Sequence, residues 1–104
     1  MKTEVFGPVV TINTFRTEEE AIQKANNSEF GLYASVYTQN LNRALRMAKA
    51  LEAGTVAINC TSPTGTYDMP QGGYKGSGVG RESRLDGMEH FLETKSVLIK
   101  VNNL

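Results

Sequence analysis

The fold is decided by the stretch from residue 30 to residue 59, which reads FGLYASVYTQNLNRALRMAKALEAGTVAIN. Residues 30–37 are a strand candidate, and the turn at 38–40 leads into a helix over roughly 41–51. Residues 55–59 are short and nearly all apolar, as expected of a buried strand in a parallel sheet, and Gly54 before them ends the helix. The stretch therefore predicts a β-α-β unit. The buried face of its helix is expected to be Leu41, Ala44, Leu45, Ala48 and Leu51.

The flanking sequence extends this alternation in both directions. Residues 9–15 alternate apolar and polar side chains, which predicts a strand. The next helix is expected to begin with a capping box, with Thr17 as N-cap and Glu20 three positions later. Residues 85–92 predict a short helix, and residues 94–101 a final strand. The order predicts an α/β fold with an open, largely parallel sheet and flanking helices.

Residues 70–82 form a glycine-rich loop, with five glycines among thirteen residues. Ordering such a loop is entropically costly, but Tyr74, Lys75, Arg81 and Glu82 provide an aromatic face and three charges that can hold it down. We therefore expect a loop fixed by contacts. It satisfies neither the dinucleotide fingerprint nor the phosphate-loop motif, so phosphate binding by this loop alone has little support.

Length and composition restrict the function classes. The chain has 104 residues, enough for one small domain, and its core looks thin enough to need a larger globule around it. Eleven basic residues balance eleven acidic ones, so charge gives no support to nucleic-acid or membrane-surface binding. No window of eighteen apolar residues predicts a membrane span, and no signal peptide is recognised. We expect a cytoplasmic protein with neither nucleic acid nor membrane as partner.

Cys60 and His90 are the single cysteine and the single histidine, which argues against a disulfide within the chain and against a metal site. Cys60 follows a predicted buried strand, where a reactive thiolate is conceivable, but the local sequence supplies no activating group. We therefore favour a small buried side chain for Cys60. His90 has no second ligand or partner in its neighbourhood, which favours a packed or surface side chain.

Glu4 and Phe6 precede a Gly-Pro turn and are two residues apart. In an extended segment this spacing puts a carboxylate and an aromatic ring on the same side. Such a pair could hold a diol and stack on a flat ring. The alternative from spacing alone is a frayed terminus.

Four blocks of the sequence resemble the NAD(P)-dependent aldehyde dehydrogenase superfamily. Residues 4–9 are similar to its E-[IV]-F-G-P-V motif, and residues 25–32 to its A-N-x-x-x-[YF]-G-L segment. Residues 51–59 resemble L-x-A-G-x-V-x-[IV]-N, and residues 70–82 resemble P-[FxQ]-G-G-[YF]-K-x-S-G-x-G-R-E. The blocks come in family order at family spacing and cover nearly the whole chain.

The resemblance implies a C-terminal part of an enzyme that oxidises an aldehyde to a carboxylic acid with NAD or NADP. Residues 1–93 would belong to its catalytic domain, and residues 94–104 would be an oligomerisation strand and tail. Glu4 matches the glutamate that holds the nicotinamide-side ribose, and Phe6 the phenylalanine beside the nicotinamide. Gln71 stands where many relatives carry an aromatic residue of the substrate pocket.

The chain also departs from the family pattern. The nucleophilic cysteine belongs to a G-Q-x-C segment and the catalytic glutamate to an E-L-G-G segment, and this sequence has neither. It also lacks the cofactor-binding Rossmann domain, and Cys60 matches a non-nucleophilic position. We therefore expect no catalytic residue in the chain and no turnover by the chain alone. The alternative is a non-catalytic interaction module that associates with full-length dehydrogenase subunits.

Overall fold

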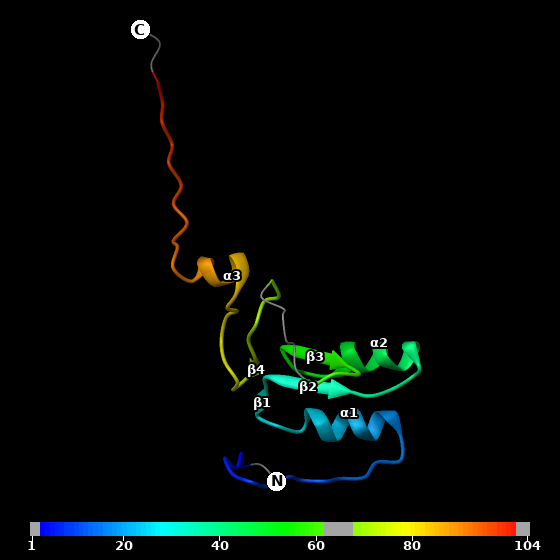
Figure 1. Ribbon diagram of the computed structural model, residues 1–104. Helices are drawn as coiled ribbons and strands as arrows, with labels where there is room; N and C mark the ends of the chain where they lie inside the picture. The colour runs from blue at the N-terminus through cyan, green and yellow to red at the C-terminus, as the bar shows by residue number, and fades with distance from the viewer. Residues whose placement is uncertain (1–2, 62–67, 102–104) are drawn as a thin grey trace.

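Figure 1 shows the computed structural model of the chain, which describes residues 3–61 and 68–101. Three helices and four short strands form among these residues. In chain order they are α1 (Glu18–Asn26), β1 (Phe30–Gly31), β2 (Tyr33–Val36), α2 (Leu41–Ala50), β3 (Thr55–Ile58), β4 (Tyr74–Lys75) and α3 (Arg84–Glu89).

The predicted β-α-β unit is present as β2, α2 and β3. β2 and β3 pair in parallel, with Tyr33 opposite Thr55 and Val36 opposite Ile58. Asn40 caps α2 by accepting a hydrogen bond from the backbone N–H of Arg43, at 2.9 Å. One face of α2 then packs on the two strands. Among residues 3–61 and 68–101, the buried ones are Ala44, Met47, Leu51 and Ala57, together with Gly31 and Gly73.

The side chain of Asn59 lengthens the parallel pair beyond its last strand residue. Its Oδ1 accepts from the N–H of Thr38 at 2.8 Å, and its Nδ2 donates to the Thr38 carbonyl at 3.0 Å. The backbone of Asn59 has a φ of 58°, a left-handed conformation that asparagine tolerates better than most residues. This turn ends β3 and redirects the chain toward Cys60.

α1 lies beside α2, and polar contacts join the two helices at both ends. Thr17 is the N-cap as predicted, accepting from the N–H of Glu20, whose own carboxylate accepts from the N–H of Arg16. Glu18 forms ion pairs with Arg46 at 2.8 Å and Arg43 at 3.3 Å. The pKa of the Glu18 carboxyl is lowered, chiefly by the hydrogen bond from Arg46.

The structure differs from the expected sheet in its pairing. The predicted strand over 30–37 divides at Leu32, because β1 pairs antiparallel with β4 of the glycine-rich loop. The described residues therefore contain one parallel pair and one antiparallel pair, each of two strands. This smaller pairing fixes the loop, as expected, and a bridge between Gln71 and Glu82 closes its base.

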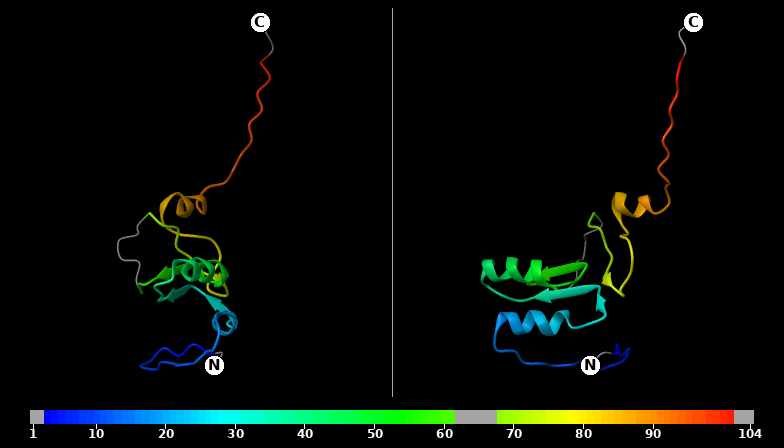
Figure 2. Two further views of the ribbon diagram at one scale, coloured as in Figure 1. Left: turned by 90° about the vertical axis from the view of Figure 1, so that its right-hand side faces the viewer. Right: turned by 180° about the vertical axis from the view of Figure 1, so that it is seen from behind.

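The strands expected over 9–15 and 94–101 do not form in the described part of the chain. Both segments are extended and exposed, and residues 92–101 project away from the body in every view (Figures 1 and 2). A strand needs a neighbouring edge for its backbone hydrogen bonds, and neither segment joins β1–β4 or β2–β3. Residues 102–104 of the predicted tail lie outside the described residues.

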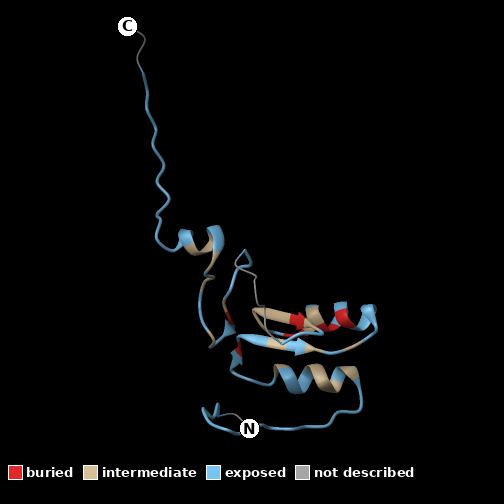
Figure 3. Cartoon of the chain, viewed as in Figure 1, coloured by how far each residue is buried: buried red, intermediate tan, exposed pale blue. Residues whose placement is uncertain are grey.

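The fold has a small core, as the sequence predicted. Most of the described residues are exposed to solvent (Figure 3). The radius of gyration is 20.0 Å, whereas a compact domain of this length has a value of about 13 Å. Within the described residues, no helix has the length and apolar character that a bilayer crossing requires.

Candidate functional site

Glu4 and Phe6 face a hollow of about 620 Å³ between the N-terminal segment and the glycine-rich loop. Ala25 and Ser28, near the end of α1, form part of its lining, and Gly76 and Ser77 of the loop form another part. The Phe6 side chain is 94% exposed, so its ring is available to a ligand. Glu4 and Phe6 thus line one hollow together with residues of the loop.

Two hydrogen bonds hold the loop side of this hollow. The N–H of Gly76 donates to the carbonyl of Glu29 at 2.8 Å. The N–H of Gly31 donates to Oγ of Ser77 at 2.9 Å. Because both bonds connect the loop to the segment after α1, the hollow has a defined wall.

Gln71 lines a second and smaller hollow of about 170 Å³. Tyr33 and Thr55, at the start of the parallel pair, form one side of this hollow, with Thr61 and Met69 also among its lining residues. Leu32 and Tyr33 line both this hollow and the one at Glu4. The two hollows are therefore neighbours that share Leu32 and Tyr33 as lining residues.

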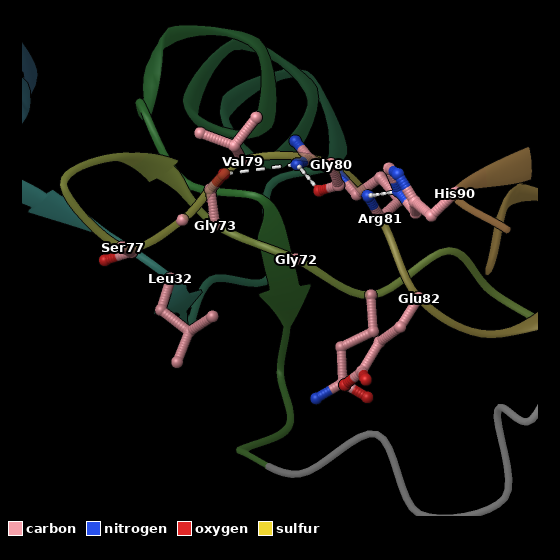
Figure 4. A pocket seen from close by; sticks show the side chains of 11 residues that line it. Leu32, Gly72, Gly73, Ser77, Val79, Gly80, Arg81, Glu82 and His90 are labelled. Carbon is pink, nitrogen blue, oxygen red and sulfur yellow. Dashed lines mark hydrogen bonds between the residues drawn. The ribbon is translucent and has the colours of Figure 1, made fainter.

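Figure 4 shows a third hollow of about 380 Å³, lined mainly by residues of the glycine-rich loop, including Gln71, with Leu32 and His90 also among its lining residues. The Arg81 guanidinium donates to the carbonyls of Gly73 at 3.1 Å and Gly80 at 2.7 Å. It also lies over the Tyr74 ring, 5.5 Å from the centroid. These contacts confirm that the charged and aromatic residues fix the loop.

His90 also contacts the glycine-rich loop. Its Nε2 accepts a hydrogen bond from the N–H of Arg81 at 3.1 Å, and its ring packs against Gly80 so closely that a Cβ there would lie 2.3 Å from Cε1. This agrees with the interpretation of His90 as a packing residue. Among the described residues, no group of three histidine, cysteine or acidic side chains could hold a metal ion.

Cys60 is exposed, whereas the sequence predicted a small buried side chain. The prediction of a buried side chain was wrong because β3 ends at Ile58 and the left-handed Asn59 turns the chain outward. The pKa of Tyr33 is raised, first by burial and then by the nearby Cys60 and Tyr37. Cys60 therefore lies near β2, whereas His90 bonds within the glycine-rich loop.

Comparison with known proteins identifies the family. The sequence model of the aldehyde dehydrogenase family matches residues 1–97. The chain belongs to the aldehyde dehydrogenase family. This confirms the resemblance carried by the four sequence blocks. An aldehyde dehydrogenase of Davidiella tassiana is 47% identical over 103 residues, covering 99% of this chain and 21% of the relative. Retinal dehydrogenase 2 of Gallus gallus is 47% identical over 100 residues, or 96% of this chain and 19% of the relative.

Two solved structures also resemble this chain. Betaine aldehyde dehydrogenase from Staphylococcus aureus, solved in complex with NAD+, is 48% identical with a TM-score of 0.85, over 90% of this chain and 18% of that one. PnpE from Pseudomonas sp. WBC-3 is 42% identical with a TM-score of 0.89, over 99% of this chain and 21% of that one. This aldehyde dehydrogenase segment thus spans about a fifth of the length of the relatives it matches.

Sequence reasoning about this aldehyde dehydrogenase segment missed the residues that hold the wall of the Glu4–Phe6 hollow. Lys75 and Asn26 connect the glycine-rich loop to the ends of α1 and α2. Lys75 was recognised as one of the charges that could hold the loop down, but its partner at Asn26 is 49 positions away. The functional roles of Glu4, Phe6 and Gln71 stay predictions.

Proposed function

We propose that this chain supplies the C-terminal portion of an NAD(P)-dependent aldehyde dehydrogenase that oxidises an aldehyde to a carboxylic acid. Residues 1–93 form part of the catalytic domain, and residues 94–104 form an oligomerisation strand and tail. The observation that carries the proposal is the hollow in which Glu4 and Phe6 face the glycine-rich loop. Family membership and the complex of the S. aureus relative with NAD+ support it.

The residues of the hollow fit the nicotinamide end of NAD(P)+. A carboxylate offers two oxygens that can accept hydrogen bonds from neighbouring ribose hydroxyls. An exposed aromatic ring offers a flat apolar face beside a planar heterocycle. The hollow, at about 620 Å³, is within the usual range of small-molecule sites. The bound dinucleotide supplies the hydride acceptor, while Glu4 and Phe6 bind and orient it.

Gln71 contributes to the aldehyde site in this proposal. It lies across Leu32 and Tyr33 from the cofactor hollow, so the two ligands meet around the start of β2. An amide side chain makes its part of the substrate wall polar, with both donors and an acceptor. In this proposal the chain contributes no catalytic residue, because it contains neither the G-Q-x-C segment nor the E-L-G-G segment of the family.

The cofactor role is tested by Glu4→Gln in the full-length dehydrogenase that contains this segment. The neutral amide cannot accept at both positions, and losing charge-assisted hydrogen bonds is expected to weaken NAD(P)+ binding by roughly tenfold to a hundredfold. Glu19→Gln, on the exposed face of α1, is the matched control. Calorimetric titration with the oxidised cofactor measures the effect, and wild-type affinity in Glu4→Gln would refute the proposed site.

The absence of catalytic residues is tested with the purified 104-residue chain. Incubated with an aldehyde and NAD+ or NADP+, it is expected to form no reduced cofactor. Cys60→Ala is the informative variant, because Cys60 is the single thiol of the chain. Steady turnover that disappears in Cys60→Ala would overturn the assignment of the nucleophile to another part of the enzyme.

A cytoplasmic homo-oligomer assembled through residues 94–101 completes the proposal. This segment is extended and exposed, with Leu98 99% exposed, which suits a strand that pairs with the sheet of another subunit. The same observation favours a second candidate, a non-catalytic module that inserts this strand into intact dehydrogenase subunits. Co-purification of the separate chain with a full-length relative, lost on deleting residues 94–104, would support the module.

A further inference from the structure

Lys75 has a backbone conformation that is unusual for a residue with a long side chain. Its φ is 53°, in the left-handed region, where a Cβ costs roughly 1–2 kcal/mol. Glycine adopts this conformation without that cost, and Gly76 follows immediately. A strained residue at such a place indicates that its side chain has a task.

The side chain of Lys75 makes three contacts away from its own loop. Its Nζ donates to the carbonyls of Asn26 at 2.8 Å and Ser28 at 3.2 Å, and it forms an ion pair with Glu52. The first two acceptors lie at the C-terminal end of α1, where backbone carbonyls lack helical partners and the helix dipole favours a cation. The Lys75 side chain is 28% exposed, so these contacts are partly shielded from water.

The acceptors of Lys75 are themselves fixed. The Asn26 side chain donates to the Ala50 carbonyl at 2.8 Å and accepts from the N–H of Glu52 at 2.9 Å. These bonds tie the end of α1 to the end of α2. We call Lys75, Asn26, Ser28 and Glu52 the lysine clasp, because together they join the loop to both helix ends.

The lysine clasp lies directly beside the loop side of the cofactor hollow. The two residues after Lys75 are Gly76 and Ser77, which line that hollow together with Ser28 of the clasp. Movement of Lys75 away from α1 would also move Gly76, whose N–H bonds to the Glu29 carbonyl. The clasp therefore acts together with the β1–β4 pairing and the bonds of Gly76 and Ser77 to fix how far the loop stands from Glu4 and Phe6.

We propose that Lys75 is a positioning residue for the nicotinamide end of NAD(P)+, acting through Gly76 and Ser77. This rests on the proposed function, which assigns that ligand to the hollow. The core residues Ala44, Met47 and Ala57 belong to α2 and β3 and are not members of the clasp. Loss of the clasp therefore acts on the hollow, and its effect on cofactor binding exceeds its effect on the aldehyde.

Four variants of the full-length dehydrogenase test the proposal. Lys75→Met keeps most of the apolar stem and removes the ammonium group. Lys75→Gly also removes it but relieves the backbone strain. Lys75→Arg keeps the charge, and Lys49→Met, on the exposed part of α2, makes the same charge change elsewhere. Calorimetry with NAD+ and NADP+ in the absence of aldehyde measures binding, and steady-state kinetics separate the KM values.

Lys75→Met and Lys75→Gly are expected to weaken cofactor binding by roughly tenfold, the effect of losing charged hydrogen bonds. The KM for aldehyde and the kcat at saturating cofactor stay at the wild-type values. Lys75→Arg restores most of the affinity, and Lys49→Met behaves as wild type. Without cofactor, amides of residues 74–78 exchange faster with deuterium in Lys75→Met than in Lys49→Met.

The opposite results overturn the proposal. Wild-type affinity in Lys75→Met, restored affinity in Lys75→Gly, or an equal rise in the KM for aldehyde would each show that Lys75 does not position the cofactor. Failure of Lys75→Met and Lys75→Gly to fold would show that the clasp serves folding in general. If Glu4→Gln weakens cofactor binding while the Lys75 variants do not, only this inference fails. If Glu4→Gln has no effect either, the proposed function fails with it.

Discussion

Gly54 of the β-α-β unit lies against the backbone of the glycine-rich loop, and Gly54→Ala tests this close packing. The residue lies between α2 and β3, where its N–H donates to the Gly31 carbonyl at 2.9 Å. A Cβ at this position would lie 1.7 Å from the carbonyl oxygen of Gly72 and 2.7 Å from its carbonyl carbon. The obstacle is backbone, so no side-chain rotation removes the clash.

The size of the effect follows from this geometry. Ordinary contact with a Cβ begins at 3.4 Å, so the Gly72 carbonyl has to retreat by about 1.7 Å. Overpacking of this kind costs typically about 1–3 kcal/mol. Because Gln71 pairs with Glu82 at the base of the loop, the displacement strains that bridge. We expect amides of residues 71–82 to exchange roughly 5- to 150-fold faster, the factor that corresponds to this free energy.

Hydrogen exchange followed by mass spectrometry measures the opening of the loop in the full-length dehydrogenase. Gly7→Ala is the matched control, because the nearest atom to its added Cβ is a Val5 methyl group at 3.9 Å. It is expected to leave exchange in residues 71–82 unchanged. Wild-type exchange in Gly54→Ala would refute the close seating of the loop on the β-α-β unit.

Two further predictions concern the β-α-β unit and its neighbour α1. Because ion pairing lowers the pKa of Glu18, its contribution to stability is present above the ordinary carboxyl pKa and is lost as pH falls through the lowered value. Glu18→Gln should therefore lower the thermal midpoint at neutral pH, and the difference from wild type should shrink in acid; a difference independent of pH would contradict this. Asn59→Ala should destabilise the chain by about 1–2 kcal/mol more than Asn59→Gly, because both lose the contacts to Thr38 but only alanine carries a Cβ into the left-handed conformation. Urea unfolding measures both variants, and equal stabilities would show that the backbone at position 59 is unstrained.

The local elements could be predicted because their determinants are close in sequence. The apolar spacing of α2, the N-cap at Thr17 and the apolar run of β3 each act within a few residues, and all three elements form where expected. The predicted buried face of α2 was wrong in part, because Leu41 and Leu45 are 72% and 54% exposed while Met47 is buried. Strand pairing behaves differently. The alternation in residues 9–15 correctly indicates an extended backbone. A strand also requires the free edge of a neighbouring strand, and residues 9–15 pair with neither of the two described strand pairs.

In the candidate site, too, features fixed by nearby residues were predictable and contacts between distant residues were not. The spacing of Glu4 and Phe6 predicted that they share a side of an extended segment, and both line one hollow. The contacts of Lys75 and Asn26 could not be predicted, because each acts through backbone carbonyls, which every residue carries. The exposure of Cys60 was missed because a single left-handed residue, Asn59, decides which way the chain leaves the sheet.

The terminal segment determines how this chain behaves in solution. Residues 96–101 read SVLIKV, with Ile99 80% and Val101 79% exposed and Lys100 as the one charge. A bare, β-prone segment of this kind stacks on identical segments when it finds no other edge. We therefore expect aggregation of the separate chain to increase with its concentration. If residues 94–101 pair with a sheet as proposed, the same pairing that provides their backbone hydrogen bonds also covers this exposed segment.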